Sequence, residues 1–262
     1  MKAYEIQSQV LKAMAGMAAV GVAVADIDKM AEEMIIGLGG KPYNKGYHPI
    51  YAATPYPAAT CISVNNCIAH GIPNTYVLRS GDIVNFDTSV IKDGQCADAA
   101  LSIGIGEVSN KNKNLLKYAK RVLYEGISVI KDGVSTEKLA EAIHTAAIRY
   151  GYKINRRFIG HGIGSEMHMP PKIYHFMQTH AEQLSSTPRQ PEYLHENQII
   201  CIEPILTYSK DDMGVFDKEG WACYTTDGKP CAMFEHMVRI TKTGCEILTD
   251  HIDDSDDIII KI

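Results

Sequence analysis

An internal repeat constrains the fold of this chain more than any other feature of its sequence. Shifted by 112 positions, the segment 21–42 (GVAVADIDKMAEEMIIGLGGKP) aligns without a gap with the segment 133–154 (GVSTEKLAEAIHTAAIRYGYKI). Both segments carry glycines at matching places near their ends, and the apolar residues between them recur with a helical period. Two unrelated amphipathic helices would share that period, which leaves an accidental match as the alternative. The matched glycines favour a duplication, so we predict two similar halves, at about 5–110 and 111–250, across a central sheet.

Hydrophobic periodicity predicts both helices and strands. The helical period marks residues 5–18, 26–37, 114–131 and 136–150, and strand-like runs cover 61–66, 82–91, 97–105, 199–204 and 236–241. No low-complexity linker divides these elements. We therefore predict an α+β fold in which residues 1–262 form a single domain.

Composition and charge argue against several classes of protein. The net charge is −5 at pH 7 and the two signs are interspersed, so we expect neither nucleic acid nor a membrane surface as a partner. No apolar run reaches the roughly 18 residues that cross a bilayer. The N-terminal segment lacks the basic region of a signal peptide, which indicates mature protein. The seven cysteines are scattered and form no CxxC motif, which predicts reduced thiols in a cytoplasmic protein.

Two carboxylates, Asp87 and Asp98, lie in the segment 81–99 (GDIVNFDTSVIKDGQCADA), which otherwise has the pattern of two strands. Strands seldom hold Asp, and a buried charge needs a partner or a metal. Asp93-Gly94 is a strong signal for a two-residue hairpin turn. That turn places position 89 opposite Asp98, and it makes Asp87 and Asp98 diagonal neighbours on one face, roughly 7–8 Å apart at the backbone. Such a pair needs a proton or a cation unless the face is exposed to solvent, which is the alternative.

Four further motifs place a histidine or a glutamate in apolar or glycine-rich surroundings. They are AHGIP (69–73), IGHGIGSEMHMPP (159–171), IEP (202–204) and MFEHMVRIT (233–241). A single histidine of this kind is more often an ordinary hydrogen-bonded residue, but Gly162 and Gly164 indicate close backbone approach. Glu203 and Glu235 bring the carboxylates in strand-like runs to four. Two divalent cations would neutralise about four negative charges without a remainder.

These motifs resemble those of the type I methionine aminopeptidases, in the pita-bread metallopeptidase family M24. The resemblance covers residues 5–248, and it implies the pita-bread fold, with pseudo-twofold α/β halves around a central antiparallel sheet. The family's ligand series falls on Asp87 in NFDTS, Asp98 in CADAA, His161 in GHGIG, Glu203 in IEP and Glu235 in FEH. We expect neither the helical insertion of the type II enzymes nor the additional N-terminal domain of creatinase-like relatives.

The resemblance also implies the chemistry of the metal centre. It implies removal of the initiator methionine with two divalent ions, and the ligand types suit Co, Mn, Fe(II) or Zn. Asp98 and Glu235 match the bridging carboxylates, and Asp87 matches a bidentate ligand of one ion. His161 and Glu203 match the ligands of the other ion, and Glu203 also matches the proton shuttle.

Further residues match the family's substrate site. His168 matches the residue that stabilises the tetrahedral species, and His70 matches the one that contacts the scissile amide or the leaving group. Ser89 matches a hydroxyl position that orients a ligand. The implied substrate-binding set is Tyr56, Cys61, His70, Met167, His168 and Trp221.

Several positions depart from the family's pattern. Ala53 stands where an aromatic residue is common and Met167 where Phe is usual, so we predict a roomier apolar pocket that still prefers Met. Ala99-Ala100 replaces a common Thr-Ser, and Met237 a frequent Thr, so a supporting hydrogen bond is expected to be missing. The loop 172–198 is longer than expected, and its Pro, Ser and His content predicts an exposed excursion.

Two alternatives stay open at this point. One is a paralogous dimetal aminopeptidase with a shifted first-residue preference, and the other is a non-catalytic descendant that binds a peptide or a protein. Retention of all five ligand positions favours the active enzyme. We expect it to act as a cytoplasmic monomer on the N-terminal Met peptides of nascent chains, with the ribosome as a further partner.

Overall fold

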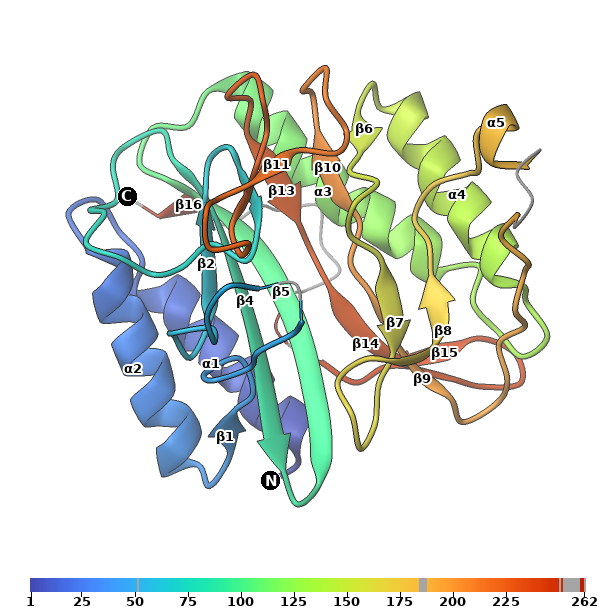
Figure 1. Ribbon diagram of the computed structural model, residues 1–262, viewed down its shortest axis with the longest axis horizontal. Helices are drawn as coiled ribbons and strands as arrows, with labels where there is room; N and C mark the ends of the chain where they lie inside the picture. The colour runs from blue at the N-terminus through green and yellow to red at the C-terminus, as the bar shows by residue number, and fades with distance from the viewer. Residues whose placement is uncertain (51, 184–187, 250, 252–259, 262) are drawn as a thin grey trace.

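The computed structural model describes residues 1–50, 52–183, 188–249, 251 and 260–261 (Figure 1). Its helices are α1 (Ala3–Met17), α2 (Val24–Gly37), α3 (Asn110–Ile127), α4 (Thr136–Arg149) and α5 (His180–Gln183). Its strands are β1 (Lys41–Pro42), β2 (Cys61–Val64), β3 (Cys67–Ala69), β4 (Ile83–Lys92), β5 (Gln95–Ile105), β6 (Lys153–Ile154), β7 (Gly160–Gly162), β8 (Met169–Ile173), β9 (Ile199–Ile202), β10 (Ile205–Thr207), β11 (Val215–Phe216), β12 (Cys223–Tyr224), β13 (Cys231–Met233), β14 (His236–Ile240), β15 (Cys245–Ile247) and β16 (Ile260–Lys261). Within this part of the chain, no helix has the length and apolarity needed to cross a membrane.

The predicted helices and strands are confirmed, with ends that move by a few residues. The largest movement at a helix start is in α3, which begins at Asn110 because Ser109 caps it by accepting a hydrogen bond from the Asn112 N–H at 3.3 Å. Strands β7, β8 and the other short strands carry no strand signal, because they are too brief, or too rich in glycine and proline, to show alternation. The mixture of helices and antiparallel strands confirms the α+β class.

Two mainly antiparallel sheets meet in the middle of the molecule. The first has the order β1-β4-β5-β16, with β2 also paired to β4 and with β16 parallel to β5. The second has the order β15-β14-β9-β7-β8. Just before β14, the backbone N–H of Glu235 donates to the carbonyl of Ala100 in β5 at 2.9 Å, which joins the two sheets. Smaller sheets have the orders β13-β10-β6 and β11-β12-β3.

Helices support both sheets from behind. Figure 1 shows α1 and α2 beside the first sheet, and α3 and α4 beside the strands of the second half. In α1, residues Ile6, Val10, Leu11 and Met14 are fully buried, and their spacing of three and four residues keeps one face on β4 and β5. One apolar cluster of buried residues contains members from all four long helices and from both sheets. The central strands are therefore anchored on a rigid core.

The repeat in the sequence has a counterpart in the backbone. Gly21 and Gly133 have φ angles of +91° and +78°, and Gly39 and Gly151 have +77° and +82°. Residues with a side chain seldom adopt these angles, so each helical segment needs glycine at both of its ends. Strands β1 and β6 also begin at equivalent positions of the repeat. On this basis we propose the duplication as the origin of the two halves; the predicted end of the second half, residue 250, lies outside the described residues.

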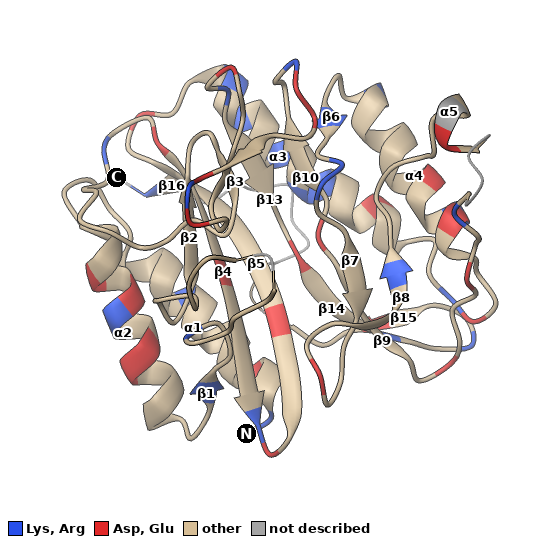
Figure 2. Ribbon diagram, viewed as in Figure 1, with Lys and Arg blue, Asp and Glu red and all other residues tan. Residues whose placement is uncertain are grey.

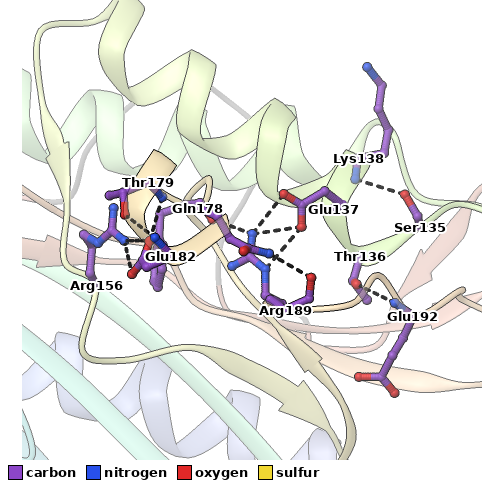
Figure 3. A network of polar contacts seen from close by, with 11 residues as sticks. Ser135, Thr136, Glu137, Lys138, Arg156, Gln178, Thr179, Glu182, Arg189 and Glu192 are labelled. Carbon is purple, nitrogen blue, oxygen red and sulfur yellow. Dashed lines mark hydrogen bonds and ion pairs between the residues drawn. The ribbon is translucent and has the colours of Figure 1, made fainter. Parts of the chain in front are cut away.

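The prediction of an exposed excursion at 172–198 is wrong for the start of that segment, because His175 and Phe176 are buried. Two ion pairs of arginines connect this segment to neighbouring parts of the second half (Figure 3). The arginines are Arg156, which pairs with Glu182, and Arg189, which pairs with Glu137. Both guanidinium groups lie over the Phe176 ring, at 4.5 and 5.8 Å from its centroid. Residues 184–187 of the predicted loop lie outside the described residues.

Candidate active site

The first two predicted ligands lie on the hairpin of β4 and β5. Asp93 and Gly94 form its turn with φ angles of +51° and +73°, the combination that a type I′ turn requires. The register pairs Ser89 with Asp98, which confirms the prediction. Asp87 and Asp98 are therefore diagonal neighbours that project from one face of the hairpin.

The other three predicted ligands belong to the second sheet. His161 is the middle residue of β7, Glu203 follows β9 and Glu235 precedes β14. The predicted close approach of the backbone is confirmed at Gly162, where a Cβ atom would lie only 2.1 Å from the carbonyl oxygen of Pro170. Since that neighbour is backbone, a side chain at this position would displace β7 and with it the imidazole.

The structure brings all five residues together. Carboxylate oxygens of Asp87, Asp98 and Glu235 lie within 4.8 Å of one another. The Nε2 atom of His161 lies 4.0 Å from Asp98 Oδ2 and 3.7 Å from Glu203 Oε1. Figure 2 shows acidic residues within β4 and β5 in the middle of the molecule, whereas the other charged residues lie mostly on helices and loops. Because Asp98 is buried and Asp87 is half-buried, the alternative of a solvent-exposed hairpin face is excluded.

Burial perturbs the ionisable groups of this cluster. Desolvation, reinforced by the neighbouring carboxylates, raises the pKa of Asp87, Glu203 and Glu235 well above the usual range. Desolvation also raises the pKa of Asp98. The same burial lowers the pKa of His161 to about 4. Without metal, the chain therefore favours neutral groups here: the acids are protonated, and the imidazole of His161 is uncharged.

This donor set fits divalent cations. The Oε1 atom of Glu235 is buried and has no hydrogen-bond partner among the described residues, a cost that a bound cation would remove. Ser89 donates a hydrogen bond to Asp98 Oδ1 at 2.9 Å, which orients that carboxylate. A ligand set of four carboxylates and one imidazole is rich in oxygen. Such a set suits Mn, Fe(II), Co or Zn better than a set of thiolate ligands would suit them.

Cys201 is a neighbour of the cluster for which the sequence carries no signal. Its sulfur lies within 4.8 Å of ligand atoms of His161 and Glu235, because β9 pairs it directly with His161. Burial and the nearby acids raise the pKa of its thiol well above the usual value. Since the thiolate is the form that binds metals, we keep Cys201 outside the proposed ligand set.

A cavity of about 490 Å³ opens beside the cluster. Its lining contains Asp87, Asp98, His161 and Glu203, together with all six predicted substrate residues, Tyr56, Cys61, His70, Met167, His168 and Trp221. Ser89 also lines it, as do residues without a signal in the sequence, namely Tyr43, Asn44, Tyr47, Arg157, Phe158, Ile159, Phe216 and Gly220. Isolated tyrosines and a lone arginine belong to no motif, so only the fold could place them at the cavity.

Aromatic rings form one wall of the cavity. Tyr56 and Trp221 meet edge to face with ring centroids 5.0 Å apart. Tyr47 lies 6.3 Å from Trp221 and 6.4 Å from the ring of His168. Ala53 is exposed and lies outside the residues that line the cavity. Ala53 itself therefore does not contact the cavity, and the prediction of a roomier pocket stays a prediction; Tyr47 supplies an aromatic ring from a neighbouring segment.

Two histidines stand beside the ligand cluster. The ring of His168 lies 4.5 Å from the ring of His161, in an edge-to-face arrangement. His70 has a φ angle of +56°, unusual for a residue with a side chain, and its ring lies 5.1 Å from that of Phe158. Burial lowers the pKa of His70 to about 4 and also lowers the pKa of His168. Both imidazoles are therefore neutral near pH 7, and each has one N–H to donate.

The departures beside Asp98 leave its surroundings bonded. The Asp98 N–H donates to the sulfur of Met237 at 3.3 Å. The carbonyl of Ala100 accepts the Glu235 N–H, and Nε2 of His251 lies 3.1 Å from the same oxygen. The buried hydroxyl of Thr88, which the register places opposite Ala99, has no hydrogen-bond partner among the described residues, so the expected loss of a hydrogen bond at Ala99-Ala100 stays a prediction.

Comparisons with known proteins find relatives along nearly the whole chain. The model of metallopeptidase family M24 matches residues 1–242. The chain is 37% identical over 247 residues to methionine aminopeptidase 1B, chloroplastic, of Arabidopsis thaliana, covering 94% of this chain but 62% of that protein. It is 35% identical over 250 residues to the methionine aminopeptidase of Aquifex aeolicus, covering 95% of this chain and 94% of that protein.

A solved structure gives the same result. The crystal structure of methionine aminopeptidase from Thermotoga maritima superimposes with a TM-score of 0.85 at 31% identity, over 95% of this chain and 94% of that one. The pita-bread fold implied by the sequence motifs is thereby confirmed.

Proposed function

This chain belongs to metallopeptidase family M24, among the methionine aminopeptidases, and we propose that it hydrolyses the first peptide bond of polypeptides that begin with methionine. One observation carries the proposal. Five dispersed metal-ligand candidates converge, and four of them line a cavity whose lining also contains apolar and aromatic side chains. This arrangement supports a hydrolase whose cavity holds the first side chain of the substrate beside the metal ligands.

We propose that Asp87, Asp98, His161, Glu203 and Glu235 hold two divalent ions, with Asp98 and Glu235 shared between them. Such ions, whether Co, Mn, Fe(II) or Zn, would acidify the attacking water and withdraw charge from the scissile carbonyl. Support for the shared carboxylates comes from their mutual approach within 4.8 Å and from the unpartnered Oε1 of Glu235.

The chain's own groups would move the protons. Glu203 lies at the edge of the cavity with its Oε1 3.7 Å from His161, and it would accept the proton of the attacking water and return it to the leaving amine. Neutral His168 would donate its N–H to the developing oxyanion. His70, which also lines the cavity, would contact the scissile amide.

The pocket would select the first side chain. Tyr47, Tyr56 and Trp221 provide rings, and Cys61 and Met167 provide polarisable sulfur, which together suit the thioether of methionine. Trp221 Nε1 donates to the carbonyl of Thr54 at 2.8 Å, and the Tyr56 hydroxyl donates to the carbonyl of Gly71 at 2.9 Å. These bonds fix the two rings before the substrate arrives.

The cellular setting is also a proposal. We propose that the protein works as a cytoplasmic monomer on nascent chains, with the ribosome as a partner. The seven cysteines are all free, and six of them are buried, which supports a reducing compartment.

Turnover of short peptides tests the function. Met-Ala-Ser, Leu-Ala-Ser and Lys-Ala-Ser would be offered to protein that has been stripped with a chelator and then reloaded with Mn, Co, Zn or Fe(II). We expect release of methionine only after reloading, with Met well ahead of Lys. Undiminished turnover by the stripped protein, or equal kcat/KM for Met and Lys, would contradict the proposal. Binding without turnover under every metal would indicate the non-catalytic alternative.

A further inference from the structure

Of the described residues that line the cavity, only Arg157 carries a permanent positive charge. Its Nε donates to the carbonyl of Met213 at 2.8 Å, and its Nη2 donates to the carbonyl of Gly214 at 3.3 Å. Its guanidinium carbon lies 5.0 Å from the ring centroid of Phe216. These contacts hold the head group in one place, at an exposed position of the chain.

No carboxylate among the described residues forms an ion pair with this guanidinium. Asp211, in the loop that provides the two carbonyls, accepts hydrogen bonds from the N–H groups of Met213 and Gly214 at 2.9 and 3.0 Å. A guanidinium has five N–H donors, and the two carbonyls use two of them. The edge formed by Nη1 and Nη2 therefore keeps donors for a planar anion.

A row of rings places Arg157 relative to the proposed site of cleavage. The ring of His70 meets that of Phe158 at 5.1 Å, and Phe158 meets Phe216 at 6.3 Å, both edge to face. Arg157 then covers Phe216, which is 40% exposed and so marks the mouth of the cavity. An extended peptide rises about 3.3 Å per residue, so the guanidinium lies within about five residues of His70.

We propose that Arg157 forms a carboxylate-binding subsite for the part of the substrate that follows the scissile bond. The anion would be an Asp or Glu side chain at the third to fifth residue, or the carboxyl terminus of a short peptide. The proposal rests on the proposed function, because it takes His70 to lie beside the scissile amide.

The expected preference is modest because the pair is open to solvent. Exposed ion pairs typically favour the charged partner by about two- to fivefold in binding, and salt weakens them. The gain should fall in KM and not in kcat, because the contact is equal in the ground state and in the transition state.

Paired peptides test the subsite. The parent Met-Ala-Ser-Gly-Ser-Gly-amide would be compared with versions that carry Glu or Gln at residue 3, 4 or 5. A second arm compares Met-Ala-Ser with a free or an amidated carboxyl terminus, which separates the two sources of the carboxylate. We expect the wild type to prefer Glu to Gln at one of the three positions, or the free acid to the amide. This preference should be lost in about 0.5 M salt, because salt screens the attraction between exposed charges.

Variants assign the preference to one side chain. Arg157→Gln should bring the Glu-to-Gln ratio to about one, and Arg157→Glu should favour a Lys peptide over the Gln peptide at the same position. Arg156→Gln is the matched control, because the neighbouring arginine points to Glu182 instead (Figure 3) and should leave the ratio unchanged.

Two outcomes overturn the subsite. One is a wild-type ratio of one in every pair, and the other is a preference that persists in Arg157→Gln. Cleavage of the neutral parent peptide by the wild type would leave the proposed function in place in both cases. If the wild type fails to cleave that parent with any metal, the proposed function is wrong and the subsite is rejected with it.

Discussion

The two halves of the molecule supply the candidate ligands in different ways. The first half provides Asp87 and Asp98 from one hairpin, where a two-residue turn sets their register. The second half provides His161 from the middle of β7, Glu203 from just after β9 and Glu235 from just before β14, and only sheet pairing brings these three strands together. The positions of the two hairpin ligands are therefore determined by local structure, and those of the other three ligands by tertiary packing.

This difference has consequences for substitution. A hairpin of ten- and eleven-residue strands keeps its register when one acid is changed, because the turn and the ladder are unaffected. In the second half, the ligand strands are short and lie against backbone, as the 2.1 Å clash at Gly162 shows. Loss of a hairpin acid should therefore separate chemistry from folding more cleanly than a change in the second half does.

The largest expected effect is that of Asp98→Asn in the hairpin. The amide keeps the shape of the carboxylate and its place beside Ser89, but it cannot serve as a charged bridging ligand. We expect turnover to fall by on the order of 10³-fold or more, because the ions stabilise the transition state by several kcal/mol. Metal content, measured by mass spectrometry, should fall below two ions per chain while the circular dichroism spectrum is retained. Unchanged turnover would mean that the hairpin acids are not ligands.

In the second half, two neighbouring histidines should behave differently. His168→Ala should lower kcat by about 10²–10³-fold, the typical cost of one oxyanion donor, with unchanged metal content. His161→Ala should lower both metal content and kcat. The two rings lie only 4.5 Å apart, so both variants leave a void at nearly the same place. Each variant therefore serves as the other's control for the general effect of such a void. Loss of one ion from His168→Ala would assign it as a ligand.

The same contrast explains how much the sequence alone could predict. The turn dipeptide Asp93-Gly94 was enough to derive the register of Asp98, because a hairpin is a local structure. The apolar period located the long helices to within a few residues, since each buries one face. The ligand positions of the second half followed from the resemblance to a family, because no local rule connects His161, Glu203 and Glu235.

Other parts of the site could not be predicted. Tyr47 brings a ring to the pocket six residues before Ala53, and no pattern in the sequence indicated it. Segments without regular secondary structure carry no period, so the direction of their side chains depends on the packed fold. Arg157 was missed for the same reason, and Cys201 because a strand pairing, not a spacing, brings it to the cluster.

Removal of the metal should show that both halves contribute acids to one buried cluster. The folded-state pKa of Asp98 is raised to about 7, and the pKa values of Asp87, Glu203 and Glu235 are raised as well. The folded, metal-free chain therefore holds protons on these acids that the unfolded chain releases near pH 4, so the contribution of the acids to stability should fall as the pH rises from about 4 to 7. Buried histidines such as His70 and His161, whose pKa values are lowered to about 4, contribute in the opposite direction, so the effect of the acids is measured as the difference in Tm between metal-free and metal-loaded protein. We expect that difference to grow by on the order of 5 °C or more over this range.

Metal-loaded protein provides the control for that titration. Bound ions keep the carboxylates ionised in the folded state, so the contribution of the acids to the change in Tm between pH 4 and 7 should disappear. In metal-free Asp98→Asn, one titrating group of the first half is gone and the slope should be shallower. A metal-free Asp98→Asn variant whose Tm depends on pH in the same way as that of the metal-free wild type would show that Asp98 is not desolvated in the folded state.

The smallest expected effect concerns the pocket, which both halves share. Tyr47 comes from the first half and meets Trp221 and His168 of the second. Tyr47→Ala should enlarge the pocket and lower the preference for Met over Leu by about tenfold, the scale on which an apolar pocket separates similar side chains. Ala53→Tyr is the matched control, because position 53 is exposed and lies outside the lining. Competition between Met-Ala-Ser and Leu-Ala-Ser measures both ratios. If Ala53→Tyr changes the ratio and Tyr47→Ala does not, the ring that selects methionine has been assigned to the wrong residue.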